Sequence, residues 1–164
     1  MLIIAPNAAY HLPLNPQGPP PTLPAMVAKG HSLRLAAEGR RHRVFVTADN
    51  ALLVQSGDDT AQLASGIEEM ITAVAILQEQ PLTLILGTEP PRIYRLLPGV
   101  SEPRASMSFD RLPARAQWHT PWGGPPAVRS LAVTSDGWVY ADIHVGSIMR
   151  SADGGIIWEP VTPT

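Results

Sequence analysis

Short runs in which apolar and polar side chains alternate recur along the chain from residue 31 onward. Leu33 and Leu35, for example, alternate with polar neighbours, the spacing expected of a strand with one buried face. The pair Ser65-Gly66 interrupts residues 61–70, so an outer strand and a connector are expected there rather than a helix. The pattern predicts an all-β chain, with further strands at residues 44–47, 51–55, 71–77, 82–87, 92–97, 117–120, 128–133, 138–143, 147–150 and 157–161.

One turn between two of these runs has an unusually defined composition, Ser151-Ala152-Asp153-Gly154-Gly155-Ile156-Ile157-Trp158. Ser and Asp side chains accept hydrogen bonds from backbone N–H groups just ahead of them. Gly154 or Gly155 supplies the positive φ that a tight hairpin needs. Trp158 is then expected to anchor the hairpin in the core. The segment predicts a structural turn and no chemistry of its own.

The same unit recurs upstream. An offset of 95 residues relates Val44 to Val139, Phe45 to Tyr140, Val54 to Met149, Ser56 to Ser151, Asp58 to Asp153 and Leu63 to Trp158. An offset of 55 relates a middle unit to the last one, carrying Leu84 to Val139, Ile93 to Ile148 and Arg95 to Arg150. The turn of the middle unit is less well kept, and Ser108-Phe109-Asp110 followed by Trp118 is its expected remnant. Repeats of about 40 residues with four strands each are typical of propeller blades.

Ser151, Asp153, Gly155 and Trp158 match every specified position of Ser-x-Asp-x-Gly-x-x-Trp. The segment therefore resembles the Asp-box of the sialidase-like (BNR) β-propeller repeat family, and Ser56 with Asp58 match it in part. The resemblance covers about residues 31–161. It implies three four-stranded antiparallel blades, at about 31–66, 67–121 and 127–164, after an N-terminal strand and a Pro-rich connector in residues 1–30.

Closed propellers have about four to eight blades. Three blades therefore predict a partial propeller, completed by a second copy in an oligomeric ring or by the remaining blades of a longer chain. The residues expected to face the missing neighbours are Leu33, Val44 and Val46 at one end and Leu131, Val139 and Ile148 at the other. The strand at 2–4 and the prolines within residues 13–25 form the expected N-terminal strand and irregular connector.

Composition narrows the functional classes. A net charge of -2 and a pI near 6.2 provide no basic field for nucleic acid. The chain has no cysteine, which excludes disulfides and thiolate metal sites. No run approaches the roughly 20 apolar residues of a membrane span, and the N-terminus lacks the basic start of a signal peptide. We therefore expect no membrane span, and a cytoplasmic location if the N-terminus is native; the compartment is otherwise open.

No catalytic set can be assembled from the sequence. Sialidases use three arginines, a tyrosine with a glutamate partner and an aspartate, whereas here only Glu89, Arg92, Tyr94 and Arg95 lie close together, and Tyr94 aligns with core positions. Other glycosidases need two catalytic carboxylates about 5–10 Å apart. Spacing along the chain does not show which carboxylates of this protein would lie that close. The five histidines are dispersed, so no metal and no cofactor are expected.

Trp122, in a loop rich in glycine and proline, is the candidate ligand contact, because an aromatic ring suits the apolar face of a sugar. The favoured function is a non-enzymatic propeller that binds a protein partner or assembles with itself, as the resemblance to photosystem assembly factors and sortilin-like receptors implies. The alternative is a carbohydrate-binding propeller or a piece of a sialidase-like glycoside hydrolase. The sequence does not specify the ligand or the number of blades in the ring.

Overall fold

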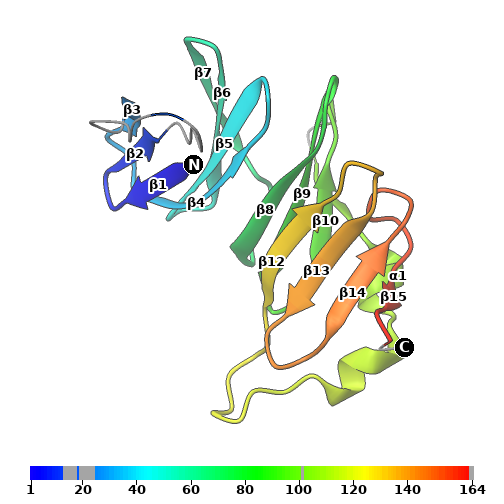
Figure 1. Cartoon of the computed structure of the whole chain (residues 1–164). Helices are drawn as coiled ribbons and strands as arrows, with labels where there is room; N and C mark the ends of the chain where they lie inside the picture. Colours follow the sequence, from blue (N-terminus) through cyan, green and yellow to red (C-terminus); the bar gives the residue numbers. More distant parts are fainter. Residues whose placement is uncertain (13–17, 19–24, 101, 163–164) are drawn as a thin grey trace.

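The computed structural model describes residues 1–12, 18, 25–100 and 102–162, and it is built almost entirely of antiparallel sheets (Figure 1). Three sheets have four strands, and a fourth sheet at the N-terminus has three. In each four-stranded sheet, strands that follow one another along the chain are hydrogen-bonded neighbours. This is the blade pattern expected from the repeats.

We call the four-stranded sheets blades 1, 2 and 3. Blade 1 comprises β4 (Leu33–Glu38), β5 (His42–Thr47), β6 (Ala51–Ser56) and β7 (Asp59–Ala64). Blade 2 comprises β8 (Met70–Glu79), β9 (Leu82–Glu89), β10 (Ile93–Leu96) and β11 (Arg104–Ala105). Blade 3 comprises β12 (Val128–Val133), β13 (Val139–Ile143), β14 (Ile148–Ser151) and β15 (Glu159–Pro160). Helix α1 (Met107–Asp110) and a 3-10 helix (Pro113–Gln117) connect blades 2 and 3.

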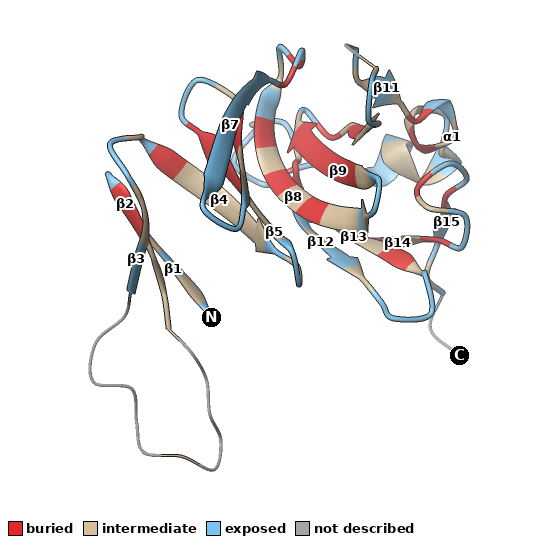
Figure 2. Cartoon of the chain, turned by 90° about the horizontal axis from the view of Figure 1, so that it is seen from above, coloured by how far each residue is buried: buried red, intermediate tan, exposed pale blue. Residues whose placement is uncertain are grey.

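The sheets stack face to face and fan around a common side, as the view from above shows (Figure 2). The first strand of each blade contacts the first strand of the next, so that β8 touches both β4 and β12. Three apolar layers result. Alternation along β5 decides the layers of blade 1: Phe45 packs toward the N-terminal sheet, while Val44 and Val46 pack toward blade 2.

The N-terminal region differs from the single strand expected there. It forms a sheet of β1 (Leu2–Ala5), β2 (Ala8–His11) and β3 (Ala25–Lys29). The expected Pro-rich connector falls mainly on residues 13–17 and 19–24, which lie outside the described residues. Alanine-rich β2 and β3 carry little of the alternation that marks a strand.

This N-terminal sheet also overturns the expected open end of blade 1. Leu33 packs in the layer that contains Ala9, and Val44 and Val46 are buried against blade 2. At the other end Val139 faces inward as well, whereas Ile148 is 49% exposed on the outer face of blade 3. The prediction of bare apolar ends was therefore wrong for every residue named except Ile148. The N-terminal sheet, which the sequence did not reveal, covers Leu33, and the others pack in the two layers next to blade 2, Leu131 among them.

The repeat offset of 55 residues agrees with the pairing of the strands, whereas the offset of 95 residues agrees only in part. Ile93 pairs with Gly87 in blade 2, and Ile148 pairs with Asp142 in blade 3, so the offset of 55 holds on both strands. Val44 pairs with Val54 in blade 1, but the partner of Met149 in blade 3 is Ala141 rather than Val139. The alignment of β5 with β13 was thus wrong by two residues, a shift that keeps each side chain on its face.

The expected outer strand of blade 2 at residues 117–120 is also wrong. The outer strand is β11, which pairs with β10 at Tyr94 and Arg95 only. Residue 117 instead ends the 3-10 helix, which begins at Pro113. Proline at the first helical position is compatible with a helix, since its missing N–H would have no helical partner there.

One polar side chain ties blade 1 to the connector that leads into blade 2. Asn50 adopts a φ of 62° in the turn between β5 and β6. Its amide nitrogen donates to the carbonyls of Glu69 (2.8 Å) and Ile67 (3.4 Å). Its amide oxygen accepts from Arg34 (2.9 Å) and from the N–H of Ile71 (3.2 Å). A single turn residue therefore fixes where the next blade starts.

No helix among the described residues is long and apolar enough to cross a membrane.

Candidate functional site

The turn from Ser151 to Trp158 is held by its own side chains. The Ser151 hydroxyl donates to the Asp153 carboxylate (2.8 Å) and accepts from the N–H of Gly155 (2.9 Å). The same Asp153 oxygen accepts from the N–H groups of Ile156 (3.0 Å) and Ile157 (2.9 Å). Gly155 has a φ of 84°, and a Cβ there would meet Ile85 at 2.6 Å, so only glycine fits.

The charge of Asp153 depends on this geometry. Desolvation by partial burial alone would raise the pKa of Asp153, but hydrogen bonds from Ile157, Ser151 and Ile156 stabilise the carboxylate more strongly and hold the pKa below its usual 3.8. The ionised turn is therefore the form present at neutral pH.

Asp153→Ala is expected to lower the free energy of unfolding by about 1–2 kcal/mol, because three donors lose their acceptor. Because the folded-state pKa lies below the ordinary value, the stabilisation is present above that value and is lost as pH falls through the folded-state pKa. Chemical denaturation at pH 7 and pH 3 checks both points, with Asp153→Asn as the variant that keeps an acceptor oxygen. An unchanged melting temperature of Asp153→Ala at pH 7 would contradict the prediction.

Trp158 joins this turn to blade 2. Its side chain is 3% exposed, and its indole N–H donates to the Gly155 carbonyl (3.0 Å). The ring packs edge-on against Phe109 of α1 at a centroid distance of 5.6 Å. Its backbone N–H donates to the hydroxyl of Ser108, also in α1 (3.0 Å). The expected remnant of the middle turn, Ser108-Phe109-Asp110, is thus helical and serves as the surface on which the turn of blade 3 rests.

Ser56 and Asp58, the partial upstream match, lie far from this turn in blade 1. Ser56 ends β6 and pairs with Asp59, so the intervening Gly57-Asp58 is a two-residue hairpin. Such a hairpin is closed by backbone pairing and does not need the side-chain acceptors used at Ser151. Trp122, the candidate ligand contact, is 65% exposed in the loop before blade 3, and its ring lies 5.1 Å from that of His144.

A polar cluster that the sequence did not assemble lies at one end of blade 2. Arg92 donates to Asp110 (2.9 and 3.2 Å), to Glu69 (3.1 Å) and to the Tyr94 oxygen (2.7 Å). The Tyr94 hydroxyl in turn donates to Glu69 (3.0 Å). Of the four residues that lie close in sequence, only Arg92 and Tyr94 take part, while Arg95 faces the opposite side of β10.

Electrostatics make this cluster a poor source of reactive groups. Burial, together with the hydrogen bond to Glu69, raises the pKa of Tyr94 to about 12, so the phenol stays protonated. Burial alone would raise the pKa of Glu69. Hydrogen bonds from its own backbone N–H, from Arg92 and from Tyr94 outweigh burial and lower this pKa. Both carboxylates are bound by the same guanidinium. The arrangement is a hydrogen-bonded network at the end of blade 2, in which Oδ1 of Asp110 is buried without a hydrogen-bond partner in the described part of the chain. Among the described residues no group of His, Asp and Glu side chains is placed to hold a metal ion.

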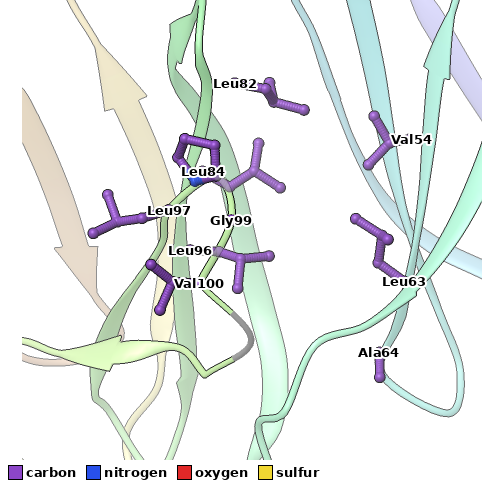
Figure 3. Close-up of a pocket in the computed structure, with 10 residues that line it drawn as sticks. Val54, Leu63, Ala64, Leu82, Leu84, Leu96, Leu97, Gly99 and Val100 are labelled. Atoms are coloured by element: carbon purple, nitrogen blue, oxygen red, sulfur yellow. The ribbon is translucent and has the colours of Figure 1, made fainter.

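A hollow of about 480 Å³ lies between blades 1 and 2 (Figure 3). We call it the inter-blade groove. Val54, Leu63 and Ala64 of blade 1 form one wall, and the opposite wall is blade 2 with the turn that follows β10, namely Leu82, Leu84, Leu96, Leu97, Pro98, Gly99 and Val100. Its volume is within the range of ligand sites, about 300–1,000 Å³.

The groove exists because the two blades have outer strands of unequal length. β7 extends for six residues, whereas β11 has two and ends its pairing before Leu96. Beyond that point blade 2 has only the tight turn in which the Val100 N–H donates to the Leu97 carbonyl (3.3 Å). Leucines that a longer β11 would help to cover therefore line an open hollow. The sequence signal was the row of leucines on β9, β10 and the turn that follows, at Leu82, Leu84, Leu96 and Leu97.

A second, polar hollow of about 520 Å³ adjoins the first and shares Ala64 with it. We call it the acidic end of the groove, since Asp49 and Glu68 are its charged lining residues. The hydrogen bond from the Thr47 hydroxyl lowers the pKa of Asp49, and the backbone N–H of Asp49 itself lowers it by a smaller amount. This carboxylate therefore stays ionised. The two hollows together present an apolar surface that ends in negative charge.

Solved structures that resemble this chain include two of YCF48. "YCF48 bound to D1 peptide" has a TM-score of 0.53 and 16% sequence identity, covering 79% of this chain. "YCF48 from Cyanidioschyzon merolae" has a TM-score of 0.55 and 12% identity, covering 87% of this chain. YCF48 is a β-propeller protein. The chain has a partial β-propeller fold.

The likeness, at these identities, concerns the propeller fold alone. The chain spans 40% and 47% of the two YCF48 chains, less than half of either. No protein-family model and no curated protein matches the sequence. Within this propeller the residues singled out from the sequence fall in three separate places: the turn of blade 3, the hairpin of blade 1 and the Trp122 loop. The inter-blade groove was not among them.

Proposed function

We propose that this partial propeller is a non-enzymatic scaffold that binds a segment of a partner protein in the inter-blade groove. The observation that carries the proposal is an apolar hollow of about 480 Å³ left open between two otherwise well-packed blades. Leu63 is 44% exposed at its rim. Exposed apolar hollows of this kind mark binding surfaces.

The similar structure described as bound to D1 peptide supports a peptide partner, since the same fold carries one there. In the same proposal the turn from Ser151 to Trp158 is an Asp-box in a structural role, with Ser56 and Asp58 as a degenerate copy. Its side chains are occupied by the turn's own hydrogen bonds, which supports a stabilising role and no catalytic one.

Leu63→Glu is expected to abolish peptide binding, because it places a charge on the apolar wall of the groove. A random ten-residue peptide library displayed on phage is selected on the whole chain, and the affinities of enriched peptides are measured by fluorescence anisotropy. We expect at least a tenfold loss with Leu63→Glu and no loss with Trp122→Ala. Thermal melting checks that both variants are folded, as their exposed positions lead us to expect.

A carbohydrate ligand at Trp122 is the second candidate function. The exposed ring, with His144 beside it, is the observation that favours it. The two candidates give opposite results in the same experiment. Oligosaccharide binding that is lost in Trp122→Ala and kept in Leu63→Glu would favour the sugar. We propose no hydrolase activity, because the two carboxylates of the polar cluster, Glu69 and Asp110, both bind Arg92.

We propose in addition that further blades pack on the two end sheets, supplied by a second copy or by a longer chain. Ile3 and Met26 on the N-terminal sheet and Ile148 on blade 3 are exposed on these faces. Light scattering at micromolar concentration is expected to show a species larger than the 17.6 kDa of one chain. A compact, cooperatively melting species of 17.6 kDa would contradict assembly of this chain with itself.

A further inference from the structure

The free edge of β7 borders the inter-blade groove at its end, where Leu63 and Ala64 line the hollow. β7 is the last strand of blade 1, and all six of its residues are exposed. In an antiparallel ladder every second residue of an edge strand directs its N–H and C=O away from the neighbouring strand. Edge strands are usually protected by lysine, proline, a bulge or a short length. β7 has no lysine, proline or bulge in the sequence Asp-Thr-Ala-Gln-Leu-Ala, its one charged residue is Asp59 at the first position, and its pairing with β6 is regular.

A strand added to this edge would continue blade 1 outward as a fifth strand. Side chains of such a strand alternate between the two faces of the sheet, about 7 Å apart on each face. Those on the face of Leu63 would lie over the groove, opposite Leu84 and Leu96 (Figure 3). An aliphatic side chain matches these walls, and the backbone of the same peptide satisfies the free groups of β7.

Charge at the acidic end selects among such peptides. Asp49 and Glu68 line that hollow, and none of its lining residues is lysine or arginine. Both hollows meet at Ala64, so one peptide reaches both within a few residues. A basic side chain is complementary to this end, and an acidic one is repelled by it.

We propose that the occupant of the groove is an extended peptide segment that pairs with β7, with an aliphatic residue in the inter-blade groove and a lysine or arginine a few residues away against Asp49 and Glu68. This inference rests on the proposed function, since it states how the partner segment is recognised. It requires neither a helical ligand nor a covalent step.

The same phage selection tests the inference through the sequences that it enriches. We expect a shared pattern of an aliphatic residue and a basic residue, without proline between them. The peptide with the strongest enrichment is then synthesised in three forms: unchanged, with its basic residue replaced by glutamate, and with alternate amides N-methylated. N-methylation on the side that pairs with β7 is expected to weaken binding at least tenfold, while methylation of the intervening amides has a smaller effect.

Glu68→Gln removes one charge from the acidic end and is expected to weaken binding about two- to fivefold, the range of one exposed ion pair. The matched control is Ser135→Lys, an equal change in charge on an exposed turn of blade 3. It is expected to leave the affinity unchanged. Raising the salt concentration should reduce the difference between Glu68→Gln and the unaltered chain.

The possible outcomes separate this inference from the proposed function. Peptides that depend on Leu63 but tolerate N-methylation at every amide, or lack a basic residue, would overturn the inference and leave the scaffold function standing. Failure to enrich any peptide that depends on Leu63 would overturn both. Self-association of the chain that is blocked by Leu63→Glu, with no such peptide enriched, would identify a second copy as the occupant and also overturn the inference.

Discussion

Trp158→Ala is expected to lower the free energy of unfolding by about 3–5 kcal/mol, the usual cost of removing a large buried aromatic side chain. The ring is 3% exposed, and it contacts Phe109 edge-on at 5.6 Å. The change also removes the indole donor to the Gly155 carbonyl, which holds the turn of blade 3. Urea denaturation followed by circular dichroism measures the loss.

Trp122→Ala is the matched control for Trp158, because Trp122 is 65% exposed. Surface substitutions usually change stability by about 0.5 kcal/mol or less. Equal losses for the two tryptophans would show that Trp158 is not buried as described.

Asn50→Ala is expected to cost about 3–4 kcal/mol. The change removes both side-chain donors and the acceptor that bridge blade 1 to the connector, at roughly 1 kcal/mol for each hydrogen bond lost. Alanine at a φ of 62° adds about 1 kcal/mol of backbone strain. Guanidinium denaturation measures the total.

Asn50→Gly separates the two contributions, since glycine accepts this φ without strain. It should be more stable than Asn50→Ala by about 1 kcal/mol and still well below the unaltered chain. A glycine variant as stable as asparagine would mean that the side-chain bridges contribute nothing to folding.

The sequence predicted local features well. Alternation placed the strands of β5, β6, β9 and β13, and the composition of Ser151 to Trp158 placed a turn. The role of Asn50 as a bridge could not be predicted, because the connector groups that it binds lie 17–21 residues downstream along the chain. Periodicity reports which face of a strand is buried and says nothing about which distant backbone group a side chain meets.

The candidate site was harder to predict from the sequence, for a related physical reason. The inter-blade groove results from the short pairing of β11, and two residues leave no periodic signal. The polar cluster joins Glu69, Arg92 and Asp110, whose proximity depends on the placement of α1. Likewise the N-terminal sheet escaped prediction because β2 and β3 consist largely of small side chains.

The hydrogen bonds between α1 and the turn of blade 3 have a consequence for the order in which the propeller comes apart. The Trp158 N–H binds Ser108, and the Ser106 hydroxyl binds the Ile156 carbonyl (3.2 Å), so each contact spans 50 residues of chain. Neither blade 2 nor blade 3 can lose its outer rim without exposing the aromatic ring of Phe109 to water. The two therefore form one cooperative unit of local unfolding, whose backbone amides exchange with solvent together.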